Sequence, residues 1–276
     1  MERRRRDEVL ITAIELAALL AAGEPVTILD VRWQLAEPDG RQAYERGHIP
    51  GAVYVSLEDE LSDHSITGHG RHPLPAGRAV EAVARRWGVR AGRPVVVYDD
   101  WNRAGSARAW WVLTAAGIPD VRVLDGGLAA WTGGIESGAV VPEPGDVTVA
   151  HSDLYSGALP TLTAEEAIAV ETLLDARAPE RFRGDVEPID PVAGHIPGAR
   201  NVPSTGLLAD DGTFLTEVEL ADVLGGAANV GAYCGSGVTA SVLVVALATL
   251  GVDAALYPGS WSEWSSDSAR PVATGD

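Results

Sequence analysis

The stretch that decides the fold is Ala232-Tyr233-Cys234-Gly235-Ser236-Gly237-Val238-Thr239-Ala240-Ser241, which holds the only cysteine among 276 residues. The apolar lead-in at 229–233 predicts the end of a strand. The nearly unbroken apolar run at 240–250, closed by a glycine, predicts a buried helix. A strand, a tight glycine loop and a helix in that order form half of a βαβ unit. Cys234 is therefore expected at the carboxyl end of a strand, facing the amino end of a helix.

This placement favours a reactive thiolate at Cys234. Unpaired backbone N–H groups and the positive end of the helix dipole converge at a helix amino terminus, and both stabilise an anion. Gly235 and Gly237 allow the backbone to curl so that successive N–H groups point at the sulfur, and Ser236 and Thr239 add hydroxyl donors. The alternative is a buried cysteine that packs as a small apolar side chain. The flanking glycines and hydroxyls favour the nucleophile.

The segment from Cys234 to Thr239 closely resembles the active-site loop of the rhodanese-like sulfurtransferases, and in particular of the mercaptopyruvate sulfurtransferases. The resemblance implies that Cys234 takes a sulfane sulfur from a small anionic donor and carries it as a persulfide. The sulfur then passes to a thiophilic acceptor such as cyanide, a small thiol or a protein thiol. The loop residues assigned to substrate binding are Gly235, Gly237, Val238 and Thr239.

Composition limits the classes of function. A chain of this length with 46% hydrophobic residues can bury one large or two medium cores. Its net charge of −18 argues against nucleic acid or an anionic membrane surface as a partner. A single cysteine excludes an internal disulfide, and the six scattered histidines show no metal-ligand spacing, so no metal or other cofactor is expected. With no second thiol to resolve a persulfide, the acceptor must come from outside.

The amino terminus resembles a signal peptide only superficially. Arg3 to Arg6 precede an apolar stretch at 9–22, but Glu15 interrupts it. Thr12 and Glu15 form a capping box that predicts the start of an amphipathic helix. No apolar run reaches the ~18 to 20 residues of a membrane span. We therefore expect a folded first helix and a cytoplasmic protein.

An internal duplication organises the chain. Five short segments recur in the same order in the two halves, and loop insertions account for the drift between copies. The pairs are 12–15 with 163–166, 29–32 with 174–177, 47–52 with 194–199, 97–99 with 232–234, and 126–131 with 259–264.

Each copy reads as helix, strand, loop, strand, helix, strand, helix, strand, which predicts an α/β fold with a mostly parallel sheet and helices on both faces. Two tandem rhodanese-like domains are expected at 1–140 and 155–276, joined by a linker at 141–154. The family resemblance implies the same architecture, with the reactive loop in the second domain. The first copy has Asp99 where the second has Cys234. Because an aspartate cannot carry a persulfide, the first domain is expected to be inactive.

Several repeated features favour a structural role. The Asp-x-Arg pairs at 30–32 and 175–177 are expected to lock a loop at the end of a strand, and His48 and His195 to satisfy local backbone groups. Three tryptophans are expected to cap the domain cores: Trp131, Trp261 and Trp264.

An anionic donor needs a cation beside the attacking thiolate. Arg181 follows a predicted strand, at the sheet edge where Cys234 is also expected, and it resembles the arginine that binds the donor's anionic group in the family. A surface ion pair is the alternative for Arg181, and Arg183 is a weaker candidate.

The position nine residues after Arg181 bears on the choice of donor. Mercaptopyruvate enzymes resemble one another in having a second arginine there, whereas this chain has Asp190, as in the thiosulfate branch. The residues after Cys234 resemble the mercaptopyruvate branch, so thiosulfate and 3-mercaptopyruvate both stay open as donors.

The mercaptopyruvate branch handles protons with the loop serine and with a histidine and a carboxylate from the first domain. The resemblance assigns these roles to Ser236, to His72 and to either Glu58 or Asp59. An exposed loop histidine is the alternative, and two further histidines are close enough in sequence to compete with His72: His64 and His69.

The predicted function is therefore a sulfurtransferase, and two alternatives are weighed against it. A cysteine phosphatase or arsenate reductase needs an arginine six residues after the cysteine, where this chain has Ala240. A non-catalytic rhodanese-type binding or regulatory module lacks the cysteine, which describes the first domain and not the second.

Overall fold

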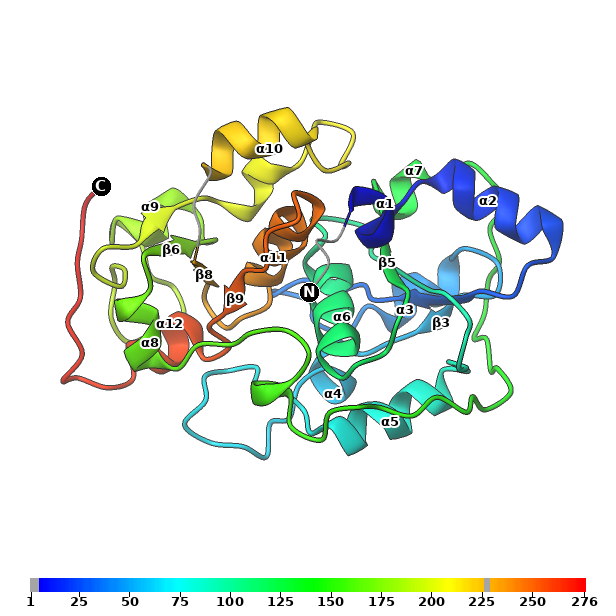
Figure 1. The fold of residues 1–276 in the computed structure, drawn as a ribbon, viewed down its shortest axis with the longest axis horizontal. Helices are drawn as coiled ribbons and strands as arrows, with labels where there is room; N and C mark the ends of the chain where they lie inside the picture. Colours follow the sequence, from blue (N-terminus) through cyan, green and yellow to red (C-terminus); the bar gives the residue numbers. More distant parts are fainter. Residues whose placement is uncertain (1–4, 226–228) are drawn as a thin grey trace.

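The computed structural model describes residues 5–225 and 229–276 and contains two parallel sheets, one in each half of the chain. The first sheet has the strand order β1-β5-β4-β2-β3 and the second has the order β7-β6-β8-β9, and every strand pair is parallel. Helices flank both sheets (Figure 1). The predicted fold of two α/β domains is confirmed. Two arginines of the basic amino-terminal run, Arg3 and Arg4, lie outside the described residues.

The elements of the first half are short and alternate between strand and helix. The strands are β1 (Leu10–Ile11), β2 (Thr27–Asp30), β3 (Val53–Tyr54), β4 (Val95–Tyr98) and β5 (Val121–Leu124). The helices are α1 (Arg6–Val9), α2 (Ala13–Ala22), α3 (Arg41–Arg46), α4 (Leu57–Glu60), α5 (Gly77–Arg86), α6 (Ala104–Ala115) and α7 (Gly127–Ala130).

The second half repeats this alternation. Its strands are β6 (Thr172–Asp175), β7 (Arg200–Asn201), β8 (Val230–Tyr233) and β9 (Ala255–Leu256). Its α-helices are α8 (Ala164–Ala169), α9 (Pro179–Phe182), α10 (Glu217–Leu224), α11 (Ala240–Thr249) and α12 (Ser260–Trp264), and two 3₁₀ helices are η1 (Leu154–Ser156) and η2 (Ser204–Leu207).

The capping box at the start of α2 forms as predicted: the Thr12 side chain accepts from the Glu15 amide, and the Glu15 carboxylate accepts from the Thr12 amide at 2.8 Å. The same box opens α8. The edge strand β1 is an unpredicted element, because two residues are too few to show the alternation of a strand. Its counterpart in the second half is a single parallel bridge between Thr161 and Leu256.

The Asp-x-Arg pairs lock a loop in both halves, as expected. Arg32 Nη2 lies 2.9 Å from Asp30 Oδ2 and donates to the carbonyl of Gly47 at 2.6 Å. In the second half Arg177 Nη2 lies 2.7 Å from Asp175 Oδ2 and donates to the corresponding carbonyl, that of Gly194, at 2.7 Å. Each buried ion pair therefore ties the end of a strand to the start of the repeated Gly-His-Ile-Pro-Gly-Ala segment.

The repeated histidines and tryptophans also have the structural positions predicted for them. His48 Nε2 lies 2.9 Å from the carbonyl oxygen of Gly138, and His195 Nδ1 lies 2.8 Å from that of Phe182. Trp261 and Trp264 are buried in the second domain's core, and Trp131 packs, partly buried, on a core cluster of the first.

The two halves meet through helices α6 and α11, which pack against each other between the sheets (Figure 1). Both helices are buried along almost their whole length, because each covers its own sheet and also the other helix. One continuous apolar core therefore spans both halves, from Trp110 and Val112 on α6 to Val242 and Leu247 on α11. This packing sets where the loop before α11 lies relative to the first domain.

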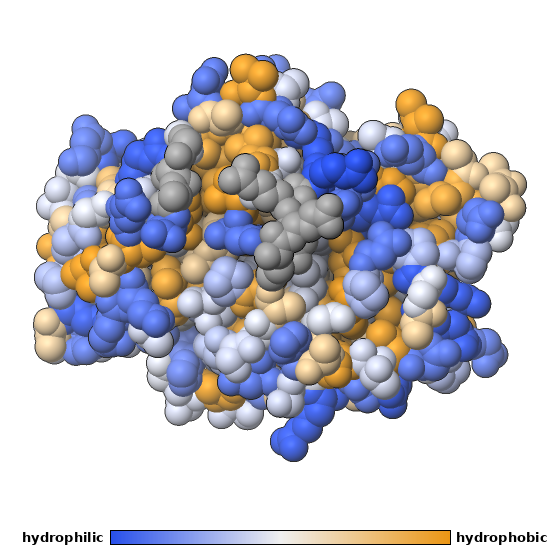
Figure 2. Space-filling model, in the orientation of Figure 1, coloured by the Kyte–Doolittle hydropathy of each residue, from blue (hydrophilic) through white to orange (hydrophobic). Residues whose placement is uncertain are grey.

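The segment at 141–154 is irregular but packs against the first half. Val147 is buried in the common core, the amide of Gly145 donates to the carbonyl of Arg85, and the amide of Gly77 donates to that of Ser152. Hydrophilic residues make up much of the face shown in Figure 2, with apolar residues between them. Among the helices in the described ranges, none is both long enough and apolar enough to cross a membrane.

Candidate active site

Cys234 directly follows β8, and five residues separate it from the first residue of α11, as the sequence predicts. It lines a pocket of about 220 Å³ whose walls come from both halves of the chain. The second half contributes the cysteine loop, and the first contributes Trp33, Leu35, Trp101 and Asn102. Over 5–225 and 229–276, the histidine, cysteine, aspartate and glutamate side chains form no group of three suited to a metal ion.

The cysteine loop is fixed by hydrogen bonds to the segment that begins α12. The amide of Cys234 donates to Ser260 Oγ at 3.1 Å, and the carbonyl of Cys234 accepts from the amide of Trp261 at 2.9 Å. The carbonyl of Gly235 accepts from the amide of Ser262 at 2.9 Å. Hydrogen bonds therefore fix the backbone on both sides of the thiol.

Among the described residues, the sulfur accepts one hydrogen bond, from the amide of Gly237 at 3.1 Å. Gly237 has φ +79°, and a Cβ on it would lie 2.6 Å from the carbonyl oxygen of Pro258, so only glycine fits. The expectation that several amides and two hydroxyls surround the sulfur is wrong for the described part of the chain. The Ser236 hydroxyl turns to another partner, and Thr239 lines the pocket, as do Gly235 and Val238.

Ser236, His72 and Glu58 form a hydrogen-bonded chain across the two halves. His72 Nδ1 lies 2.7 Å from Ser236 Oγ, and His72 Nε2 lies 3.1 Å from Glu58 Oε1. The indole N–H of Trp33 donates to Glu58 Oε1 at 2.6 Å. His72 comes from the segment before α5, and the α6–α11 packing brings it to the loop of the second domain.

The geometry distinguishes the competing residues of this region. Asp59 accepts from the Ser56 hydroxyl at 2.7 Å, so Glu58 is the carboxylate that reaches His72. His64 Nε2 lies 3.0 Å from the other oxygen of Glu58, and His69 packs beside a tyrosine ring instead.

Electrostatics assigns the protons in this chain. Burial raises the pKa of Glu58, but hydrogen bonds from His72 and Trp33 outweigh it and lower the pKa to about 2. Burial lowers the pKa of His72 below its ordinary value more than Glu58 raises it. At pH 7 the carboxylate is therefore charged and the imidazole neutral. The Nε2–H of His72 then donates to Glu58, and Nδ1 can accept the hydroxyl proton of Ser236.

Arg108 is a buried cation that sequence reasoning missed. Its Nη2 donates to the carbonyls of Leu61 at 3.1 Å and His72 at 3.0 Å, so it holds the His72 segment against α6. Burial lowers its pKa to about 10. The sequence signal for it was an arginine inside the apolar run of α6, because burying a charge costs free energy unless the charge is paired or hydrogen-bonded.

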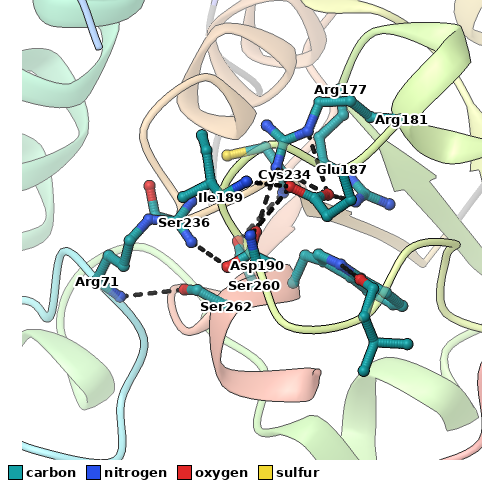
Figure 3. Close-up of polar contacts among 12 residues, drawn as sticks. Arg71, Arg177, Arg181, Glu187, Ile189, Asp190, Cys234, Ser236, Ser260 and Ser262 are labelled. Carbon is teal, nitrogen blue, oxygen red and sulfur yellow. Dashed lines mark hydrogen bonds and ion pairs between the residues drawn. The ribbon is translucent and has the colours of Figure 1, made fainter. Parts of the chain in front are cut away.

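Among the described residues, those that line the pocket include three arginines and no carboxylate: Arg71, Arg177 and Arg181. Each arginine pairs with a carboxylate outside the lining, Arg71 with Asp190, Arg177 with Asp175 and Arg181 with Glu187. Arg181 Nη2 lies 2.7 Å from Glu187 Oε1 and 3.2 Å from Asp190 Oδ2, both of which lie outside the lining (Figure 3). Arg181 is thus both ion-paired and open to the pocket.

Two further arginines, Arg71 and Arg183, differ from what the sequence analysis expected. Arg71 was missed, and it reaches the pocket from the first half and pairs with Asp190. Arg183, the weaker candidate, is absent from the lining and pairs with Asp185 at 2.8 Å on the surface.

The first half carries a closed copy of the cysteine loop. Asp99 occupies the position of Cys234 and is buried. Its carboxylate accepts from the amide and hydroxyl of Ser106 at 3.0 and 2.7 Å and from the amide of Trp101 at 3.1 Å, and it pairs with Arg103. The carboxylate thus satisfies the loop's own donors.

The proton assignment predicts how His72 titrates. Replacing Glu58→Gln removes the negative charge that raises the pKa of His72 and weakens the hydrogen bond to a neutral one, while burial, Arg108 and His64 continue to lower the pKa. The pKa of His72 should therefore fall further, as measured by NMR titration of the imidazole nitrogens. Asp59→Asn is the matched control and should leave the titration unchanged. A pKa that rises or stays the same in Glu58→Gln contradicts the assignment.

Comparison with known proteins gives a consistent result. The Rhodanese-like domain family matches residues 12–133 and 161–267. A Mycobacterium tuberculosis protein with the name "Putative thiosulfate sulfurtransferase SseB" is 66% identical over 98% of both chains. A Pseudomonas aeruginosa protein named probable 3-mercaptopyruvate sulfurtransferase is 44% identical over 97% of this chain and 98% of its own. The crystal structure of Escherichia coli SseA, a 3-mercaptopyruvate sulfurtransferase, superposes with a TM-score of 0.78 at 34% identity, covering 92% of this chain and 98% of that one. The chain therefore belongs to the rhodanese-like family and is a two-domain sulfurtransferase.

Proposed function

We propose that this sulfurtransferase carries the transferred sulfur as a persulfide on Cys234. The observation that carries the proposal is the placement of this thiol, which follows β8, accepts the amide of Gly237 and lies in a pocket whose charged residues are all arginines. Such a pocket attracts an anionic donor and reduces its repulsion from an attacking thiolate. Cys234 is only 2% exposed, but it lines this pocket, and packing as a small apolar side chain does not explain the arginines around it.

The reaction has two half-reactions. The Cys234 thiolate attacks the outer sulfur of the donor, an S–S bond forms, and the bond between that sulfur and the rest of the donor breaks with its electron pair on the leaving group. With thiosulfate the leaving group is sulfite. With 3-mercaptopyruvate it is the enolate of pyruvate, which then takes up a proton. The persulfide then gives its outer sulfur to cyanide or a thiol and regenerates the thiolate.

The donor favoured by the geometry is 3-mercaptopyruvate. Its leaving enolate must be protonated, and the chain Ser236–His72–Glu58 can relay a proton at hydrogen-bond distances of 2.7 and 3.1 Å. Ser236 lies two residues from Cys234, so of the three relay side chains it is the one nearest in sequence to the reacting thiol. Arg181 binds the donor's carboxylate in this proposal, and Gly235, Val238 and Thr239 shape the wall around it.

Thiosulfate is the second candidate donor. The relative SseB carries that name and is 66% identical to this chain. Sulfite leaves as a stable anion that needs no proton, so thiosulfate would use the arginines and not the relay.

The nucleophile is assigned to the second domain alone. We place the domains at 1–140 and 155–276 with a linker at 141–154, since the family matches end at residue 133 and resume at 161. The first domain, with Asp99 in its loop, supplies a pocket wall and the relay histidine. The cytoplasm is the proposed location, because thiols stay reduced there.

Replacing the nucleophile tests the mechanism. Cys234→Ser should lower sulfur transfer to cyanide about a thousandfold or more with either donor, because the hydroxyl cannot form a persulfide. The measurement is steady-state thiocyanate formation with thiosulfate and with 3-mercaptopyruvate. Equal activity of wild type and variant would exclude the persulfide, and an inactive wild type would favour a binding module.

Removing the relay separates the two donors. Ser236→Ala should lower kcat with 3-mercaptopyruvate about a hundredfold, since protonation of the enolate loses its source. The same variant should keep its kcat with thiosulfate. Ser65→Ala, an exposed serine near His64, is the matched control and should behave as wild type with both donors. Equal losses with both donors would remove the relay from the mechanism.

A further inference from the structure

Arg108 is a buried cation at the boundary between the two halves of the chain. It lies on α6, the helix that packs on α11, and its side chain is fully buried. Within residues 5–225 and 229–276 no carboxylate forms an ion pair with its guanidinium, and Nη1 has no hydrogen-bond partner. Burying an unpaired charge costs free energy. A fold that holds such a charge beside a reaction site is therefore expected to use it.

The guanidinium of Arg108 holds both ends of one loop. Residues 61–72, which we call the strap, run from the end of α4 to the relay histidine. Nε and Nη2 of Arg108 donate to the carbonyl of Leu61 at 3.3 and 3.1 Å, and Nη2 also donates to the carbonyl of His72 at 3.0 Å. One side chain therefore closes the strap and fixes the backbone that carries the imidazole of His72.

The charged groups around the His72 imidazole come from three segments. Burial is the largest cause that lowers the pKa of His72, and Arg108 from α6 and His64 from the strap lower it further. Glu58 from α4 raises that pKa. Arg108 is the fixed cation of this group, since its own pKa of about 10 keeps it charged at pH 7. The uncharged side chains that contact the ring are Ser236 and Trp33.

We propose that Arg108 is a positioning residue of the proton relay, which closes the strap behind His72 and whose buried charge disfavours a second cation at the imidazole. The inference rests on the proposed function, since it names what keeps the relay in its working form. A neutral His72 can take the thiol proton of 3-mercaptopyruvate through Ser236 and return it to the enolate. The S–S bond forms, the C–S bond breaks with its electron pair on carbon, and one proton moves from sulfur to carbon. An imidazolium cannot take up that proton.

Removing the charge should move the acidic limb of the pH profile. Arg108→Gln keeps N–H groups that can donate to the strap carbonyls but loses the charge, so the pKa of His72 should rise. Below the new pKa a larger share of His72 is imidazolium. The ratio of kcat with 3-mercaptopyruvate to kcat with thiosulfate should therefore fall about tenfold near pH 6 and return to the wild-type ratio above about pH 8.

The experiment measures thiocyanate formation by the full-length chain with both donors from about pH 6 to about pH 9, together with NMR titration of His72. The ratio of the two kcat values cancels any effect on the nucleophile, which matters because Cys234 lies within reach of the Arg108 charge. Arg108→Lys keeps a charge and should keep the acidic limb of wild type. Arg78→Gln, an exposed arginine on α5, is the matched control and should match wild type. Thermal unfolding checks that each variant is folded.

A raised His72 pKa and a ratio that recovers at high pH in Arg108→Gln, with neither change in Arg108→Lys, support the proposal. An unchanged ratio in Arg108→Gln, or a loss that is the same at every pH, overturns it. If Arg108→Gln does not fold, Arg108→Met is the second uncharged variant. If neither folds, a wild-type His72 pKa at or above about 6.5 overturns the proposal, and a lower value that Arg108→Lys reproduces supports it. Turnover of thiosulfate that still requires Cys234 shows that the proposed function stands even where the Arg108 assignment fails.

Discussion

The packing of α6 on α11 is the contact on which the site depends. It joins the two domains, and it makes one apolar core continuous through both of them. The same contact places His72 of the first domain 2.7 Å from Ser236 of the second, and it brings the walls of both domains around Cys234. A small thiol loop thus gains a proton relay and a set of cations that it could not hold by itself. In the proposed mechanism, catalysis therefore depends on both domains, although the nucleophile belongs to one of them.

The loops at Asp99 and Cys234 occupy the same position in the two domains but differ in their contacts. Both keep the buried Asp-x-Arg lock and the same turn motif, because these elements stabilise the end of a strand in each domain. The loops themselves differ in what they hold. Asp99 satisfies its own loop from within, whereas Cys234 leaves a nearly unpartnered sulfur facing a pocket. The Asp99 carboxylate occupies the donors of its own loop, whereas Cys234 lines a pocket.

Local signals were enough to predict the fold and the position of Cys234 between a strand and a helix. The glycine loop, the apolar runs and the repeated segments each carry their information within a few residues, and the capping box at Thr12 was readable for the same reason. His72 and the choice between Glu58 and Asp59 depended on family resemblance, and only the geometry could separate the two carboxylates. Arg71 and Arg108 escaped prediction because their roles come from contacts with distant segments, such as the approach of Gly70 to Gly259. The number of donors to the sulfur was overestimated, since no sequence pattern shows which way the Ser236 hydroxyl turns.

The central claim is that one sulfur atom is held covalently on Cys234 between the two half-reactions. Intact-protein and peptide mass spectrometry after treatment with donor, in the absence of acceptor, tests it most directly. The account predicts that the protein gains the mass of a single sulfur atom, located on the peptide that contains Cys234 and lost again on addition of cyanide. A protein that turns over donor and acceptor without ever carrying this extra sulfur would contradict it.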